Sequence, residues 1–245
     1  MENDNKMQEA VKRLKAAQDE ICREMYALAK SAGLSNDNVK PITDGVYDIA
    51  AYLSSIKVMW VLKEPYDDFK DGKPYGGGWE VYEAFDYNGA WANRTWQPII
   101  YSMYGLFYNL HWQDMDYIRD KPEMVNILKR LAYINISKMP AHKQTNDAML
   151  WEYYEIWRPI LLKQIEIYAP DVIVFGNTFR YFKRDLVGEE TQPDKIFDGY
   201  SFCTYHKNDT LLIDAYHPNQ KRITRETYVN TIIDLVREWA GGKKL

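Results

Sequence analysis

Cysteine is scarce in this sequence, with Cys22 and Cys203 the only two among 245 residues. Two cysteines exclude a disulfide framework, and they exclude a four-cysteine zinc or iron–sulfur site within the chain. Such scarcity is typical of a reducing compartment, so we expect a cytoplasmic protein. His111, His142 and His206 have no partner at metal-ligand spacing, and no H-E-x-x-H pair is present. We therefore expect no metal site and no cofactor.

Long apolar runs and excess positive charge are also missing. No run approaches the ~20 apolar residues that span a bilayer, and the start, M-E-N-D-N-K-M, has no signal-peptide pattern. We therefore expect no membrane partner. The formal net charge is −4, whereas nucleic-acid-binding proteins usually show a basic footprint. The overall balance counts mildly against DNA as a partner, although it does not exclude a local basic face.

Three common catalytic and cofactor motifs are absent. No G-x-S-x-G motif is present, which argues against a serine hydrolase. The three glycines at 76–78 lack the spacing and the Lys-Ser/Thr pair of a phosphate-binding loop. No dinucleotide-binding fingerprint follows the first predicted strand. The sequence therefore excludes the most easily recognised hydrolase and nucleotide-binding classes.

Short apolar runs do occur, and they alternate with longer stretches of helical periodicity. At 46% hydrophobic residues, the chain can bury a full core. The alternation predicts a three-layer α/β/α fold with a central, mostly parallel four-stranded sheet. Because no repeat or linker is visible, we expect a single α/β domain over 1–245, with an N-terminal helical extension (1–45) and a core (55–240).

The individual elements are predicted from periodicity and from helix-capping signals. We expect strands at 58–62, 132–136 and 171–175, and a β-hairpin formed by 201–206 and 211–215. We expect helices at 5–32, 96–110, 120–130, 146–168 and 178–186, and a last helix between the cap Thr224 and Gly241. Gly33 is the expected stop of the long first helix, because glycine readily adopts the left-handed conformation.

The first predicted strand, Val58–Leu62, ends in a group of polar residues. It is followed by Lys63, Glu64, Pro65 and Tyr66. Proline has no N–H to donate to a neighbouring strand, so the strand should stop there. An amine, a carboxylate and a phenol are therefore expected at the carboxyl end of a central strand, where ligands bind in open α/β sheets.

Later strands end in the same way. Asn135 lies at the end of the second strand, Gly176 and Asn177 follow the third, and His217 follows the hairpin. Parallel strands would bring these residues to the same edge as Glu64. Glu64 would then orient or deprotonate a water, and His217 would stabilise negative charge on a leaving group. Asn135 offers one acceptor and two donors to an amide-like edge.

Taken singly, each residue has an ordinary alternative. Glu64 alone would be a solvated charge, Asn135 alone a turn former, and His217 with Pro218 a loop. Aromatic side chains, with 20 Tyr and 8 Trp, are mostly expected in packing. Only the shared position at strand ends indicates a hydrolytic site.

Four segments, in order, resemble the motifs of the uracil-DNA glycosylase superfamily over roughly residues 55–240. The run 62–67, L-K-E-P-Y-D, is similar to the first motif G-Q-D-P-Y-H. The run 133–140, Y-I-N-I-S-K-M-P, resembles Y-I-T-N-V-V-K-C-R-P-P of the iron–sulfur branch with one residue deleted. The strand at 171–176 and the His217-Pro218-Asn219 run resemble the remaining two, the last of which is H-P-S.

The sequence departs from these motifs at defined positions. Leu62 and Lys63 replace the initial Gly-Gln, and Asp67 replaces the final His. The cluster cysteines are absent, so the resemblance implies no iron–sulfur cluster. The serine-rich loop after the His-Pro pair is replaced by Asn-Gln-Lys-Arg at 219–222.

The resemblance implies a pocket for a flipped base. In it, Glu64 handles the water, His217 stabilises the departing base anion and Asn135 contacts the base edge. The other residues assigned to the substrate are Lys63, Tyr66, Gly176 and one ring of the 69–79 loop, either Phe69 or Tyr75. The residues assigned to phosphates of a nucleic acid are Lys138, Lys221, Arg222 and Arg225.

The leading hypothesis is a DNA glycosylase-like hydrolase that binds a flipped base and cleaves an N-glycosidic bond. DNA, single- or double-stranded, is then the expected partner. The alternative is a non-catalytic nucleic-acid- or nucleotide-binding protein that retains the glycosylase fold, favoured by Lys63, Asp67 and the negative charge. A third possibility is an enzyme acting on a free nucleoside or another small molecule.

Overall fold

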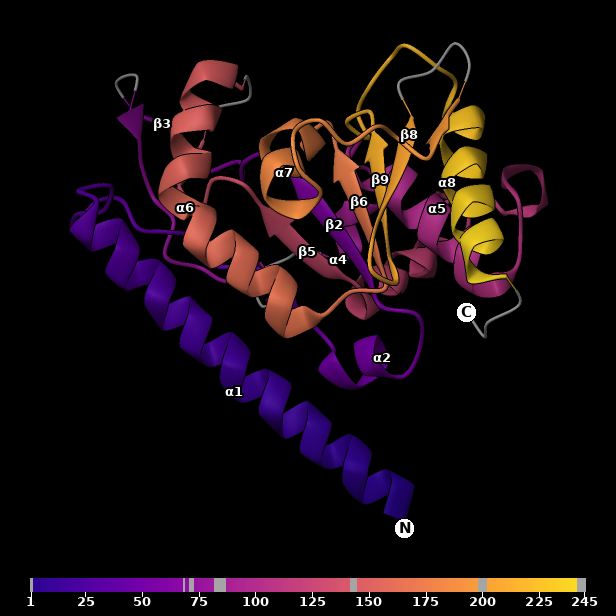
Figure 1. Cartoon of the computed structure of the whole chain (residues 1–245), viewed down its shortest axis with the longest axis horizontal. Helices are drawn as coiled ribbons and strands as arrows, with labels where there is room; N and C mark the ends of the chain where they lie inside the picture. Colours follow the sequence, from indigo (N-terminus) through magenta and orange to yellow (C-terminus); the bar gives the residue numbers. More distant parts are fainter. Residues whose placement is uncertain are drawn as a thin grey trace.

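The computed structural model describes residues 2–67, 69–70, 73–81, 87–141, 145–197 and 202–241. Within this part, one seven-stranded sheet has the order β1-β5-β2-β6-β9-β8-β7 (Figure 1). Its strands are β1 (Gly45–Val46), β2 (Val58–Leu62), β5 (Ala132–Asn135), β6 (Val172–Gly176), β7 (Lys195–Ile196), β8 (Cys203–Lys207) and β9 (Thr210–Ala215). A separate pair is formed by β3 (Phe69–Lys70) and β4 (Lys73–Pro74).

The four central strands β5, β2, β6 and β9 are mutually parallel, and the outer strands are antiparallel to their neighbours. The predicted α/β class is therefore confirmed, but the predicted sheet of four strands was too small. The four strands are only its parallel centre. The two outermost strands, β1 and β7, have two residues each, which is too short to produce an apolar run or an alternation.

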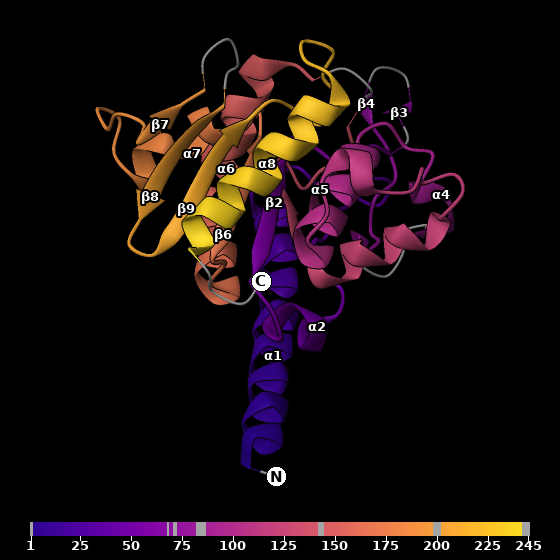
Figure 2. The same cartoon turned by 90° about the vertical axis from the view of Figure 1, so that its right-hand side faces the viewer.

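Helices cover both faces of this sheet (Figures 1 and 2). One face packs against α1 (Glu2–Ser31), α6 (Asp147–Tyr168) and α7 (Phe179–Leu186). The other packs against α5 (Trp96–Tyr108), η2 (Pro122–Arg130) and α8 (Arg225–Ala240). Shorter elements are α2 (Ile49–Leu53), α4 (Tyr87–Ala90) and η1 (Trp112–Asp114). No helix in the described ranges is both long and apolar enough to cross a bilayer.

Strand β2 is buried along its whole length, as its unbroken apolar sequence predicts. Met59 and Val61 join the core under α1, α6 and α7, whereas Trp60 and Leu62 join the core under α5 and α8. Alternate side chains of a strand point to opposite faces. Burial on both faces places β2 in the middle of the molecule and aims its carboxyl end at one edge.

The long first helix is confirmed and belongs to the core. Its residues Leu14, Ile21 and Met25 are buried in the cluster that contains α6, and its N-terminal half projects beyond the sheet (Figure 2). Gly33, just past its end, has φ +69°, the left-handed conformation expected of a stop. The 1–45 segment therefore supplies part of one face.

Two of the predicted helices begin just after a residue that caps them. Asn146 accepts hydrogen bonds from the backbone N–H of Ala148 at 3.0 Å and of Met149 at 3.3 Å, and Thr224 accepts one from Thr227 at 3.1 Å. The predicted helix at 120–130 differs. It is a 3₁₀ helix that begins at Pro122, two residues later than predicted.

Candidate functional site

The carboxyl ends of the four parallel strands meet at one edge of the sheet. Leu62 pairs with Asn135 across β2 and β5, and Gly176 pairs with Ala215 across β6 and β9. The chain therefore leaves β2 and β9 at the same edge, with one strand, β6, between them. Glu64 lies two residues past the end of β2, and His217 lies two residues past the end of β9.

Glu64 is half-buried beyond β2. Burial, opposed by the nearby Lys63 ammonium and assisted by the Asp147 carboxylate, raises the pKa of Glu64 to about 7. A carboxylate with a pKa near the working pH is well matched to taking a proton from water. This shift makes Glu64 a candidate general base.

His217 is neutral at physiological pH. Burial, together with the Lys63 ammonium, lowers the pKa of the His217 imidazole to about 4. Its Nδ1 accepts a hydrogen bond from the backbone N–H of Asn219 at 3.2 Å. The neutral ring therefore carries its proton on Nε2, which can donate to a ligand.

Lys63 links these two groups electrostatically, because its ammonium lowers the pKa of both Glu64 and His217. Its side chain is only 15% exposed, and Nζ lies 3.3 Å from an oxygen of Asp147 at the start of α6. Arg180 of α7 lies 2.8 Å from the same oxygen. One positive charge, held by Asp147, thus lowers the pKa of both the acid and the imidazole.

Replacing Lys63 with methionine is expected to raise both pKa values, Glu64 above about 7 and His217 above about 4, because the ammonium lowers both. The His217 pKa is measured by NMR titration of its ring proton, and that of Glu64 by ¹³C carboxyl titration. Lys221→Met, at an exposed site, is the matched control and should leave both unchanged. A His217 midpoint that does not move in the Lys63 variant would contradict this geometry.

Asn135 is almost completely buried, at 1% exposure. Its backbone N–H donates to Asp44 at 2.7 Å, and its side-chain Oδ1 accepts from the Tyr133 hydroxyl at 2.9 Å. Its Nδ2 has no hydrogen-bond partner in the described part of the chain. Asn135 therefore has its oxygen occupied and its donors unused.

Gly176 has no side chain, and this leaves room for Leu62 and Pro218 to pack against its backbone. A Cβ at Gly176 would lie 2.4 Å from Cδ2 of Leu62 and 3.1 Å from Cδ of Pro218. The space above Gly176 is therefore filled by Leu62, which replaces the motif glycine, and by the proline next to His217. This packing gives Gly176 a role in positioning His217, besides the substrate contact inferred from the resemblance.

Gly176→Ala is expected to lower the free energy of unfolding by about 1–3 kcal/mol, because the added methyl overpacks the contact with Leu62. Leu62→Ala removes the nearest obstacle, so the double variant should lose less than the sum of the two single losses. Urea denaturation of all four proteins measures this coupling. Strict additivity would show that the two side chains do not compete for this space.

Two of the aromatic residues assigned to the base lie on the surface. Tyr66 is 62% exposed and Tyr75 is 39% exposed, while the side chain of Phe69 falls outside the described part. Asp67 accepts hydrogen bonds from the backbone N–H of Gly77 at 2.8 Å and from the Trp79 indole at 2.7 Å. Asp67, which replaces the motif histidine, therefore anchors the glycine-rich loop.

The basic residues divide into two groups. Lys221 and Arg222 are exposed after His217, Arg225 is half-buried at the start of α8, and the Arg222 guanidinium lies 5.5 Å from the Tyr216 ring. These three residues remain candidates for phosphate contacts.

Lys138 is not a candidate for phosphate contacts, and its assignment to nucleic-acid binding was wrong. It is 0% exposed, with Nζ at 2.6 and 2.9 Å from the Asp44 carboxylate and 2.8 Å from Oε1 of Gln164. Its three donors are used inside the protein, so no phosphate can reach it.

One acidic residue near the edge was missed by the sequence analysis. Burial, opposed by Arg180, raises the pKa of Asp214 to about 7. Asp214 follows the apolar run L-L-I of β9 and is the second-last residue of the strand, on the face occupied by Leu212. A carboxylate near the end of an apolar strand is a pattern from which Asp214 could have been predicted as a site residue. No sequence signal marked Arg180, and Tyr133 was marked only as the first residue of the run that resembles a family motif.

The two remaining histidines with described positions, His111 and His206, show no sign of ligation. His206 lies 2.7 Å from Asp194, and His111 lies 2.8 Å from Asp234, both as surface pairs. Among the residues with described positions, no group of three or more His, Cys, Asp and Glu is arranged to hold a metal ion. His142 falls outside the described part.

Comparison with known proteins adds nothing to this geometry. No protein-family model matches the chain, and no curated protein matches it. The assignment of the site therefore depends on the residues at the sheet edge and on their electrostatics.

Proposed function

We propose that this protein hydrolyses an N-glycosidic bond, with the base bound at the carboxyl edge of β5, β2, β6 and β9. The observation that carries the proposal is the pairing of a Glu64 with a pKa of about 7 and a neutral His217 under the influence of the same Lys63. Two groups with pKa values shifted in opposite directions are the signature of divided acid and base roles.

The chemistry needs only water as co-reactant. Glu64 accepts a proton from a water while the water oxygen forms a bond to C1′ of the sugar. The C1′–N bond breaks and its electron pair leaves with the base, which becomes an anion. The Nε2–H of His217 donates to that anion, and the nearby Lys63 ammonium favours the same charge. The products are a free base and an abasic sugar.

Nucleic acid is the favoured carrier of the base. Lys221 and Arg222 are exposed just after His217, where they can contact phosphates flanking the reacting nucleotide. Tyr66 and Tyr75 expose rings on the adjoining loop, and exposed rings stack on unpaired bases. The net charge of −4 restricts such contacts to this local surface.

A glycosylase assay tests the proposal directly. Single-stranded oligonucleotides containing one uracil, hypoxanthine or xanthine are incubated with the protein, and the released base is measured by liquid chromatography. We expect release of at least one of these bases. No release from any of them, where a known glycosylase acts on all three, would contradict the proposed hydrolysis.

A non-catalytic binding protein is the second candidate, and one observation favours it. Leu62 covers Gly176 at the edge where the base would approach. A binder would show affinity for the same oligonucleotides without turnover, and that affinity would fall with rising salt as phosphate contacts are lost. A binding titration at several salt concentrations, run beside the assay, separates the two functions.

A further inference from the structure

The first turns of α1 project beyond the sheet, as Figure 2 shows. From Asp4 to Arg13 each side chain is exposed except that of Val11, which is half-buried. Burial in the core begins at Leu14. An isolated helix of fewer than about 12–15 residues is only marginally stable in water. A projecting helix end of this kind is therefore stabilised by a surface that covers it.

A groove lies between this part of α1 and the body of the protein, with a cavity volume of about 670 Å³. One wall is a single face of α1, made of Lys6, Glu9, Ala10, Arg13, Leu14 and Ala17. The other wall is made of Leu53, Lys57 and residues 167–169. Because Lys57 precedes β2 and Ala169 precedes β6, the groove lies at the amino ends of the parallel strands. It is therefore separate from the candidate site, which lies at their carboxyl ends.

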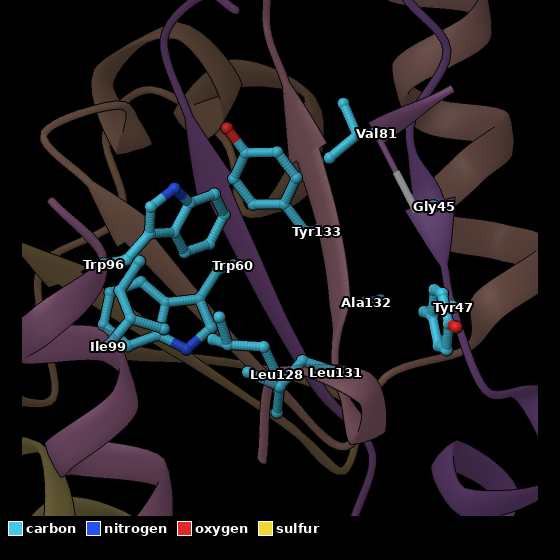
Figure 3. Close-up of a pocket in the computed structure, with 10 residues that line it drawn as sticks. All are labelled: Gly45, Tyr47, Trp60, Val81, Trp96, Ile99, Leu128, Leu131, Ala132 and Tyr133. Carbon is cyan, nitrogen blue, oxygen red and sulfur yellow. The ribbon is translucent and has the colours of Figure 1, made fainter. Parts of the chain in front are cut away.

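The groove has room for several side chains of a partner, unlike the pocket beneath α5 and η2. That pocket, shown in Figure 3, lies among Trp60, Trp96 and Tyr133 and has a cavity volume of about 30 Å³. Such a volume holds about one or two waters. The groove is far larger, and the body contributes the apolar side chains of Leu53 and Ile167 to it. Its size and lining are those of a surface that accepts another helix.

The α1 wall of the groove carries an acid and a base one helical turn apart. Glu9 and Arg13 form an ion pair within α1, and their side chains are 62% and 77% exposed. Exposed ion pairs of this kind contribute little to stability, so either charge can exchange its partner at small cost. Lys57, on the opposite wall, lies 3.8 Å from Asp171. The wall formed by α1 is thus the part of the groove that offers both signs of charge to a partner.

We propose that the groove receives the amino-terminal part of α1 from a second copy of this chain, with the two helices antiparallel about a two-fold axis beside Val11. A two-fold contact uses the same surface twice. In this arrangement Glu9 of each copy faces Arg13 of the other, whereas a parallel pair would set Glu9 against Glu9. Lys6 lies opposite Ala17, which carries no charge.

The small side chain of Ala10 suits this arrangement, because it lies on the same face of α1 between the two charges. The separation of packed helices, about 8–10 Å, depends on the size of the side chains at the contact. Two alanines near the axis let the helices approach closely, so that Leu14 of each copy can pack against the other helix. The charges then surround an apolar centre, as in other protein interfaces.

Sedimentation velocity of the full chain over a range of concentrations tests the association. We expect a monomer–dimer equilibrium in which the dimer predominates at high concentration. A native protein that stays monomeric at the highest concentration at which it remains dissolved would overturn the inference. The measurement does not depend on glycosidic hydrolysis, so failure of the proposed function would leave this result unchanged.

Charge reversal tests the pairing itself. Glu9→Arg would place two arginine pairs across the axis, and Arg13→Glu would place two glutamate pairs there. Each single variant should therefore raise the dissociation constant of the dimer by about tenfold or more. An equimolar mixture of the two variants should form a heterodimer of near-native affinity, because both contacts then join an arginine to a glutamate. Single variants that dimerise like the native protein, or a mixture as weak as the single variants, would overturn the inference.

Arg23→Glu is the matched control. Arg23 pairs with Glu20 on the same helix, so this variant also sets like charges side by side on α1, but neither residue lines the groove. Its dimer should keep the native dissociation constant, and circular dichroism should show the same helix content in all the variants. A control that weakens the dimer as much as Glu9→Arg does would overturn the inference, because the loss would then come from the helix and not from the pairing.

Discussion

Glu64→Gln is expected to reduce the rate of base release by about 10²–10⁴-fold, the usual contribution of a general base. Glutamine keeps the shape of the side chain but cannot accept a proton from water. Single-turnover release from the best oligonucleotide measures the loss. Glu166→Gln, an exposed position on α6, is the control and should stay close to the native rate. A Glu64 variant with native activity would remove Glu64 from the mechanism.

The pH dependence of the native rate tests the same role. Because burial raises the pKa of Glu64 to about 7, the ionised base accumulates as pH rises, and the rate should climb through a midpoint near pH 7. The residual rate of the Glu64→Gln variant should lack this step.

The contribution of Glu64 to stability should fall as pH rises, whereas the rate should climb. Glu64 has a folded pKa of about 7 against an ordinary value of 4.5, so between these values the folded state holds a proton that the unfolded state has lost. The contribution of Glu64 to the free energy of unfolding is therefore present at low pH and is lost as pH rises through about 7. Above pH 7, Glu64→Gln should have a higher melting temperature than the native protein.

Lys138→Ala is expected to lower the free energy of unfolding by about 3–5 kcal/mol, because it leaves the Asp44 carboxylate buried without its counter-charge. Lys138 and Asp44 are both 0% exposed, so water cannot replace the missing ammonium. Lys221→Ala, which removes an exposed lysine, should change stability by less than about 0.5 kcal/mol. Urea denaturation measures both variants.

The control for desolvation is the double variant Asp44→Asn with Lys138→Met. It removes both charges together, so it should be more stable than Lys138→Ala. A Lys138→Ala protein as stable as the native one would show that the Asp44 pair contributes little. Asp44 also accepts a hydrogen bond from the backbone N–H of Asn135, so Lys138→Ala should weaken base binding as well.

Much of the fold could be predicted because its signals are local. Strand β2 has the expected limits, Val58–Leu62. Helix α6 begins at Asp147, one residue after the expected start, and α8 begins after the expected cap, Thr224. Capping bonds and apolar periodicity act over a few residues. The short strands β1 and β7 carry no such signal, and they exist only because a neighbouring strand offers hydrogen bonds.

The candidate site was only partly accessible to the same reasoning. Strand ends placed Glu64 and His217 at one edge because parallel strands share their direction. The Tyr133 hydroxyl on Asn135 and the Leu62 side chain over Gly176 could not be predicted. Both contacts depend on side-chain directions that the packed helices impose on the strands.

The sequence by itself determined the long helices, the central strands and the edge at which the polar strand ends collect, since those properties follow from patterns of neighbouring residues. Only the tertiary structure decided which polar side chains face a ligand and which are consumed inside the protein. Lys138 and Lys221 both looked like surface cations, yet Lys138 pairs with Asp44, 94 positions away in the chain. The burial and ion pairing of a charged side chain such as Lys138 are set by contacts between distant segments, and no local pattern marked them in this sequence.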